Sequence, residues 1–180
     1  MAKSTAATKP EKDTQRSTVH KEEPDAIALL KADHRQVEGW FEEFEKAEAG
    51  NRKRELADQI CEALKVHTTI EEEIFYPAFF EATEEEDLHN EAQVEHDGAK
   101  YLIQKIEGSG PDDELFDAQV KVLSEMIKHH VNEEEKRGGM FAKARQSEMD
   151  LDALGEQLAS RKAELQGKSR PKLVDTLTRA

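Results

Sequence analysis

The sequence contains a single cysteine, Cys61, in 180 residues, so an internal disulfide is excluded. This scarcity fits a reducing compartment, and the N-terminal residues include no apolar signal segment, so we expect a cytoplasmic protein. No apolar run approaches the ~20 residues that span a bilayer. With a mean hydropathy of −0.85, the chain is predicted to have no membrane partner.

Positive charge is also in deficit, because 26 Lys and Arg residues face 40 Asp and Glu residues, which makes the net charge −14. This balance argues against a nucleic-acid partner, since such binding depends on Lys and Arg side chains that neutralise phosphates. Only 36% of the residues are hydrophobic, whereas 37% are charged. A chain this polar folds only if its few apolar residues share regular faces.

The apolar residues do recur at alternating spacings of three and four, as on one face of a helix. Breaks at Gly50, at Pro77, in the segment Gly108-Ser109-Gly110-Pro111 and at Gly138-Gly139 interrupt this pattern. We predict long helices over about 24–48, 51–76, 83–107 and 112–137, and a weaker helix over 150–165. A capping box formed by Thr83 and Glu86 is expected to begin the third helix.

Four long helices with short connections predict an all-α protein, an antiparallel up-down four-helix bundle with an additional C-terminal helix. No segment has the pattern of a strand. We assign residues 1–23 to a disordered tail, 24–146 to the bundle, 147–167 to the C-terminal helix and 168–180 to a second tail.

The most informative residues are polar side chains at core-facing positions of the predicted helices. Each of the four long helices carries one histidine on its apolar face, and two of these histidines are followed one turn later by a glutamate: His34, His67, His96, His130, Glu71 and Glu134. A buried polar group without a partner costs kilocalories, and a metal ion would supply partners for all six. A His-x-x-x-Glu pair puts both side chains on one helix face, about 6 Å apart, close enough to ligate one ion or to bridge two.

The arrangement occurs twice, because 33 residues separate His34 from His67 and 34 separate His96 from His130. Each half delivers a lone histidine and then a His-x-x-x-Glu pair, which predicts a nearly two-fold arrangement around two ions. A single core histidine is more commonly a hydrogen-bonded residue than a ligand. Four that converge from four helices favour a metal site.

The fourth helix offers two registers, His130 with Glu134 or His129 with Glu133, and the offset between the two halves permits both. His130 follows Ile127 by three residues and so continues the apolar face of this helix. His129 lies on a face with fewer large apolar residues. We therefore prefer His130 and Glu134 as the interior pair.

Imidazole and carboxylate groups without thiolates suit iron, manganese or zinc. Six candidate ligands are too many for one structural zinc, which closes with four. Two ions that share bridging carboxylates accommodate the six side chains. A bundle that binds zinc in a purely structural role is an alternative.

The chain resembles the hemerythrin-type HHE cation-binding domain over about residues 25–145. The resemblance is carried by four motifs, Asp33-His34, His67-Thr-Thr-Ile-Glu71-Glu72-Glu73-Ile-Phe-Tyr-Pro77, Glu95-His96 and His129-His130-Val-Asn-Glu133-Glu134-Glu135. It implies a four-helix bundle around two iron ions, bridged by two carboxylates and an oxo or hydroxo group. Carried over to this chain, the four histidines would be terminal ligands, while Glu71 and Glu134 would bridge.

One departure from this family concerns a fifth histidine that oxygen-carrying hemerythrins possess. The positions four residues before and after His96 are Ala92 and Lys100, and neither is a suitable ligand. The missing imidazole leaves a position for water, peroxide or another side chain, such as Tyr101 or Glu72.

Two classes of function follow from this resemblance. We expect a binding protein that holds oxygen, nitric oxide or peroxide at its di-iron centre, in sensing, storage or the oxidative-stress response. The alternative is an enzyme that decomposes hydrogen peroxide or reduces oxygen, because a more open metal centre exchanges ligands more readily. No residue is assigned a catalytic role.

Overall fold

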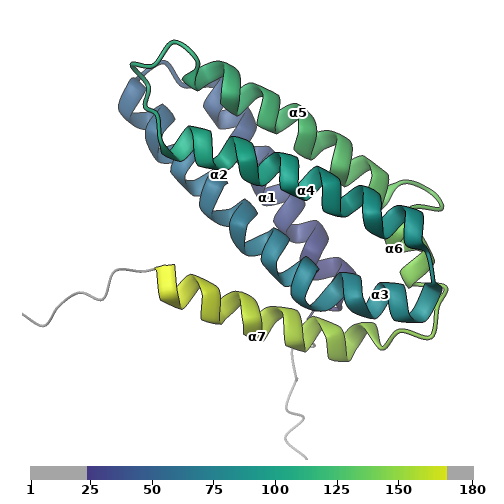
Figure 1. The fold of residues 1–180 in the computed structure, drawn as a ribbon. Coiled ribbons are helices and arrows are strands. Elements are labelled where there is room, and N and C mark those ends of the chain that lie inside the picture. The colour runs from purple at the N-terminus through teal and green to yellow at the C-terminus, as the bar shows by residue number, and fades with distance from the viewer. Residues whose placement is uncertain (1–23, 170–180) are drawn as a thin grey trace, which may run out of the picture.

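The computed structural model describes residues 24–169, and every regular element in that range is helical (Figure 1). The predicted tail over 1–23 and most of the one over 168–180 lie outside the described residues. The elements are α1 (Ala26–Lys46), α2 (Gly50–Ile70), the π-helical turn η1 (Glu71–Phe75), α3 (Tyr76–Thr83), α4 (Glu86–Glu107), α5 (Phe116–Glu135), α6 (Met140–Ala144) and α7 (Leu151–Ser169). None of these helices combines the length and apolar character needed to cross a membrane.

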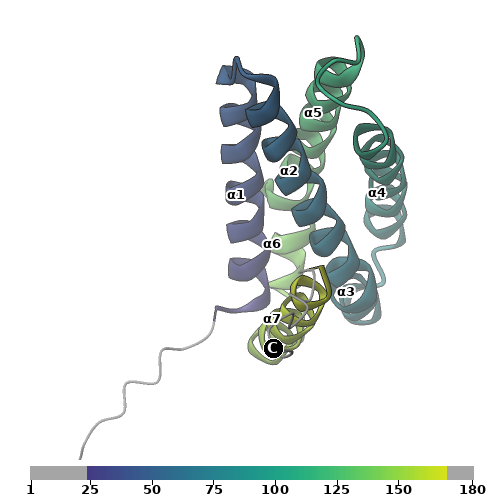
Figure 2. The ribbon, with the colours of Figure 1, turned by 90° about the vertical axis from the view of Figure 1, so that its left-hand side faces the viewer.

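The helices α1, α2, α4 and α5 run side by side as an antiparallel bundle, seen from two directions in Figures 1 and 2. Only three residues connect α1 to α2, so these neighbours must run in opposite directions. The predicted fold, an all-α up-down four-helix bundle with an additional C-terminal helix, is confirmed.

Two helix starts differ from the sequence prediction. Thr83 does not begin a helix but ends α3, where its hydroxyl donates to the Phe79 carbonyl at 2.7 Å and Glu84 takes a left-handed conformation with φ 54°. The next helix starts only at Glu86, so the predicted capping box is wrong. The fourth long helix starts at Phe116 rather than near 112, because residues 110–115 form turns instead.

The segment before Pro77 is a π-helical turn rather than a simple kink or helix end. The Tyr76 amide donates to the Glu71 carbonyl, five residues earlier, so the helix widens over one turn before Pro77, which has no amide proton to donate. The side chains of Glu71 and Tyr76 are both fully buried, although residues five apart lie on different faces of a regular α-helix. The wide turn therefore brings a carboxylate and a phenol to the same interior position.

Two apolar clusters fill the bundle, one at each end of its long axis. The first contains Phe41, Leu64, Ala99 and Ile127, and the second contains residues that precede or follow these on the same helices, such as Leu30, Ile70 and Ala92. On α1, α2 and α4 the core histidine lies between residues of the two clusters. The six candidate ligands therefore occupy a polar layer between two apolar regions.

The helix α7 lies across the bundle and packs against α1, α2 and η1 (Figure 2). Leu154 and Leu158 are its buried apolar contacts with the second cluster. A Cβ atom on Gly155 would lie 2.5 Å from the Pro24 carbonyl oxygen, so a glycine is needed where α7 meets the start of α1.

Two valines on α5 provide a matched test of this packing. Val120 is 1% exposed and belongs to the first apolar cluster, whereas Val122 is 45% exposed. We expect Val120→Ala to lower the free energy of unfolding by about 2 kcal/mol through lost burial and a cavity, and Val122→Ala to change it by about 0.5 kcal/mol or less. Urea unfolding followed by circular dichroism measures both, and equal losses would contradict the assigned orientation of α5.

Candidate metal centre

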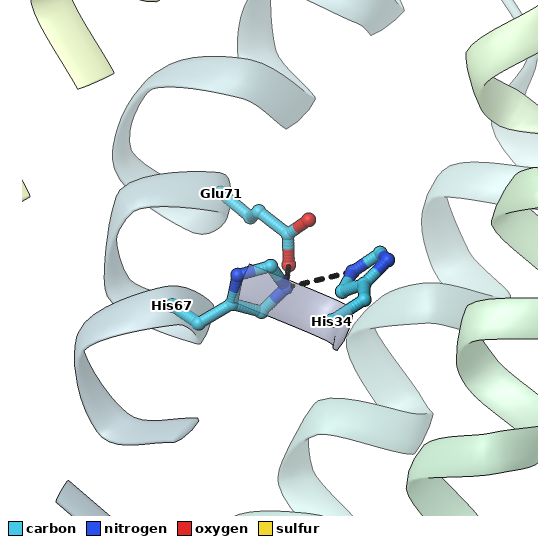
Figure 3. Close-up of side chains that lie close together, drawn as sticks. All are labelled: His34, His67 and Glu71. Atoms are coloured by element: carbon cyan, nitrogen blue, oxygen red, sulfur yellow. Dashed lines mark hydrogen bonds and ion pairs between the residues drawn. The ribbon is translucent and has the colours of Figure 1, made fainter. Parts of the chain in front are cut away.

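Four histidines, one from each long bundle helix, meet in two pairs in the polar layer. The Nε2 atoms of His34 on α1 and His67 on α2 lie 3.1 Å apart (Figure 3). The Nε2 atoms of His96 on α4 and His130 on α5 lie 3.2 Å apart. All four rings are buried and turn the same nitrogen toward the centre.

Two glutamates connect these pairs. The Oε2 atom of Glu71 lies 3.2 Å from His67 Nε2 and 3.4 Å from His96 Nε2, so it contacts one histidine of each pair. The Oε2 atom of Glu134 lies 3.4 Å from His34 Nε2 and 3.7 Å from His130 Nε2, and so contacts the other two. The arrangement has the two-fold character that the repeated spacing predicts.

The protein does not satisfy every polar atom of this layer. Glu71 Oε1 and Glu134 Oε2 are buried and have no hydrogen-bond partner within the described residues. Buried carboxylate oxygens in that state are costly, and a cation between them and the Nε2 atoms would give them partners. The residues present therefore fit a metal centre: two overlapping groups that share Glu71, one with His34 and His67 and one with His96 and His130, have donor atoms within 4.8 Å of one another.

The structure also separates the two registers of α5. His130 and Glu134 are buried in the polar layer, whereas the His129 side chain is 61% exposed. His129 Nε2 lies 3.2 Å from Glu95 at the surface. The register that follows the apolar face of the helix is the one that points inward.

One residue in the polar layer, Tyr76, was not predicted from the sequence. Its hydroxyl donates to Glu134 Oε1 at 3.1 Å, and it lies 3.4 Å from Glu71 Oε2 and 3.2 Å from His96 Nε2. The suggestion that Tyr101 adds a ligand is wrong, because Tyr101 is 60% exposed on α4. Only the π turn places Tyr76 inside, and no spacing rule for a regular helix predicts that.

A second layer of carboxylates surrounds the histidines. The Nδ1 atoms of three rings, His34, His96 and His130, lie 2.7–2.9 Å from carboxylate oxygens, of Glu135, Glu72 and Glu95 respectively. A carboxylate at Nδ1 fixes the ring orientation and strengthens Nε2 as a metal ligand. The Glu72 carboxylate thus supports His96 from behind, and it also binds Lys100 at 2.6 Å.

The fourth ring, His67, has a weaker partner. The nearest carboxylate oxygen to its Nδ1 atom is Asp33 Oδ2 at 3.6 Å, beyond hydrogen-bond distance, and Nδ1 is unsatisfied. The other oxygen of Asp33 accepts from Lys162, which belongs to α7. His67 is therefore the one inner histidine whose Nδ1 atom has no carboxylate within hydrogen-bond distance.

The four histidines and two glutamates of the polar layer form the inner layer of the site. Burial and neighbouring charges shift the pKa values of its members in different directions. Burial disfavours the charged form of His67, but the Glu71 and Asp33 carboxylates together outweigh it and raise the pKa of His67 to about 10. Burial lowers the pKa of His34 to about 4 despite its bond to Glu135. Burial, followed by repulsion from Glu71, raises the pKa of Glu134 to about 8. In the metal-free chain a proton on His67 thus balances the charge of Glu71.

The geometry defines a class of protein: a helical bundle with a buried histidine and carboxylate centre suited to metal cations. The sequence model of the family described as hemerythrin HHE cation-binding domain matches residues 25–142, and the chain belongs to that family. A solved structure of an HHE cation-binding domain-containing protein from Mycobacterium kansasii shares the fold, with a TM-score of 0.68 and 22% identity, over 81% of this chain and 89% of that one.

A curated relative has a different name. A protein from Nostoc sp. named DNA nickase is 26% identical over an alignment of 110 residues, and the match covers 59% of this chain. The matched part is 30% of that protein, so this chain spans less than a third of the relative's length.

The His34 ring predicts a pH dependence of stability in the metal-free chain. Its folded pKa of about 4 lies below the ordinary value of 6.5, so the unfolded chain takes the proton first as the pH falls. The contribution of His34 is present above pH 6.5 and is lost as the pH falls toward 4, by on the order of 3 kcal/mol.

This loss is measured by urea unfolding of the chelator-treated chain and of His34→Gln between pH 7 and 4. The comparison removes the opposing contribution of Glu134, whose raised pKa favours folding as the pH falls from about 8. We expect the natural chain to lose more stability than His34→Gln. Parallel curves would contradict the lowered pKa.

Proposed function

We propose that the inner layer holds two iron ions, with manganese or zinc as the alternative metals. In this arrangement His34, His67, His96 and His130 are terminal ligands, and Glu71 and Glu134 bridge. The observation that carries the proposal is that each carboxylate faces one histidine of each pair, at 3.2–3.7 Å. A bridging role for both glutamates accounts for that placement, and for their unsatisfied oxygens.

The centre is proposed to bind a small ligand, namely oxygen, nitric oxide or peroxide, in sensing, storage or the oxidative-stress response. Bound iron would supply exchangeable positions and redox chemistry, because six protein ligands shared by two ions leave sites for a ligand. The chain has Ala92 and Lys100 where oxygen carriers of the family use a further histidine, which supports a more open centre.

The surrounding residues orient the ligands and exclude water. Phe141 on α6 stacks on the His34 ring with a centroid distance of 5.8 Å, and Phe75 contacts Phe141 edge-on. At His34, His96 and His130 the outer carboxylates hold the ring proton on Nδ1 and leave Nε2 free to bind a metal. These contacts keep the rings in place.

The second candidate function is an enzyme that decomposes hydrogen peroxide or reduces oxygen. The observation that favours it is the Tyr76 hydroxyl, a buried hydrogen-bond donor within 3.4 Å of both glutamates. Burial and the two carboxylates raise the pKa of Tyr76 well above its ordinary value, so the phenol keeps its proton. Such a donor can orient or protonate a small oxygen ligand.

The partner is proposed to be a small molecule rather than a nucleic acid. The net charge of −14 supports this, since phosphate binding draws on basic surfaces. The relative named DNA nickase makes DNA the competing partner, and nicking of a supercoiled plasmid by the metal-loaded chain tests it directly. Nicking that depends on the inner-layer residues would favour DNA.

The metal content of single variants tests the proposed ligands. The natural chain is expected to contain about two irons, with the absorption bands of a bridged ferric pair, whereas His67→Ala, Glu71→Ala and His130→Ala each lose at least one ion. The matched control is His129→Ala, whose ring lies at the surface and which should keep both ions. Stoichiometric zinc without such bands would refute the redox function, and full occupancy in His130→Ala would refute the assigned ligands.

Stopped-flow absorption with oxygen and with hydrogen peroxide separates the two functions. A binding protein should show one saturable spectral change per centre and no turnover. An enzyme should release oxygen from peroxide repeatedly, and Tyr76→Phe, which removes only the hydroxyl, should slow that release about 100-fold or more if Tyr76 is the proton donor. Unchanged turnover in Tyr76→Phe would exclude that role.

A further inference from the structure

His67, the inner-layer histidine with the most distant supporting carboxylate, points to a role for the C-terminal helix. Three histidines bind a carboxylate at Nδ1 within 2.9 Å, but Asp33 stays 3.6 Å from His67 Nδ1. The difference coincides with Lys162, which binds the other oxygen of Asp33. The outer carboxylates of the other rings also have cationic neighbours, Lys31 and Arg35 at Glu135 and Lys100 at Glu72, yet they keep their histidine contacts.

The location of Lys162 makes this contact separable from the rest of the centre. Lys162 lies in α7, which begins at Leu151, beyond residues 25–142 that match the family. The pair it forms with Asp33 is at the edge of a cleft of about 240 Å³, whose lining also includes Trp40 of α1 and Gln59 of α2. The Asp33 side chain therefore lies between this cleft and the His67 ring.

The neighbouring residue of α7, Arg161, forms a comparable anchor without touching the centre. Its guanidinium binds both carboxylate oxygens of Glu73 in η1, at 2.7 and 3.1 Å. Arg161 and Lys162 thus each contribute one positive charge and one ion pair to the docking of α7, but only Lys162 contacts a carboxylate that faces a candidate ligand.

We propose that Lys162 is a positioning residue that holds the Asp33 carboxylate away from His67, so that the C-terminal helix weakens one of the two metal positions relative to the other. The inference rests on the proposed function, because it requires two bound ions. A carboxylate 3.6 Å from Nδ1 supports an imidazole less strongly than one that lies within 2.9 Å of it. The position built on His34 and His67 is therefore the weaker one.

The two members of the pair have opposite effects on metal affinity. Removal of the Lys162 ammonium lets Asp33 move onto His67 Nδ1 and removes a positive charge near the ions, so affinity rises. Removal of the Asp33 charge leaves His67 without support, so affinity falls. A residue that only stabilised the fold would lower affinity in both cases, and the opposite signs distinguish the two roles.

Titration of the metal-free full-length chain with Co²⁺, followed by its visible absorption, measures both binding steps. The natural chain is expected to bind in two resolved steps. In Lys162→Met the weaker step tightens about tenfold and the steps approach each other, and in Asp33→Asn it weakens about tenfold. Lys162→Arg, which keeps the charge and the ion pair, should bind as the natural chain does.

Arg161→Met is the matched control, because it removes an equal charge and a docking contact from the same helix. It should lower the stability of α7 but leave both Co²⁺ steps in place. If Lys162→Met does not fold, Lys162→Gln, which keeps a neutral donor beside Asp33, carries the same expectation of a tighter weak step.

A second readout follows the hydrogen bond itself in the Zn²⁺-loaded protein. The Nδ1 proton of His67 should move downfield in the proton NMR spectrum of Lys162→Met, as expected for a shorter bond to Asp33, and stay in place in Arg161→Met. Equal Co²⁺ affinities in Lys162→Met and Arg161→Met, or a looser weak step in Lys162→Met, would overturn the role of Lys162. Failure of the natural chain to bind two ions would refute the proposed function instead.

Discussion

The whole structure depends on the burial of six side chains, the candidate metal ligands, in a core that cannot satisfy them alone. Four imidazoles and two carboxylates interrupt the apolar faces of the bundle, and two of their oxygens have no hydrogen-bond partner within the described residues. Without cations, such a layer lowers the free energy of unfolding. The two apolar clusters on either side of it supply the packing that offsets this cost.

Charge is balanced outward from the centre in layers. The inner histidines are backed by carboxylates at Nδ1, and several of those carboxylates are backed in turn by lysine or arginine side chains. Each layer orients the one inside it, because a hydrogen-bonded ring cannot rotate without losing its partner. Among the four histidines, His67 has the most distant supporting carboxylate, Asp33. The cation that binds this carboxylate is Lys162 of α7.

The local backbone is adapted to the same centre. A regular α-helix could not direct Glu71 and Tyr76 to one interior point, and the π turn η1 does so by inserting one residue into the helical repeat. Pro77, which donates no hydrogen bond, follows where the helix resumes. The chain thus gains a buried phenol beside both glutamates at the position where its regular periodicity breaks.

The sequence alone was sufficient for the helical class, the bundle, and the six inward-facing side chains, because apolar residues spaced by three and four define helix faces whatever the tertiary context. It also favoured His130 over His129 for that reason. Tertiary structure alone decided that Tyr76 lies in the polar layer and that α5 starts at Phe116. It also decided the placement of the outer carboxylates and the contact of Lys162 with Asp33. The π turn breaks the regular period, and the outer contacts join residues up to 129 positions apart, so neither leaves a local pattern to read.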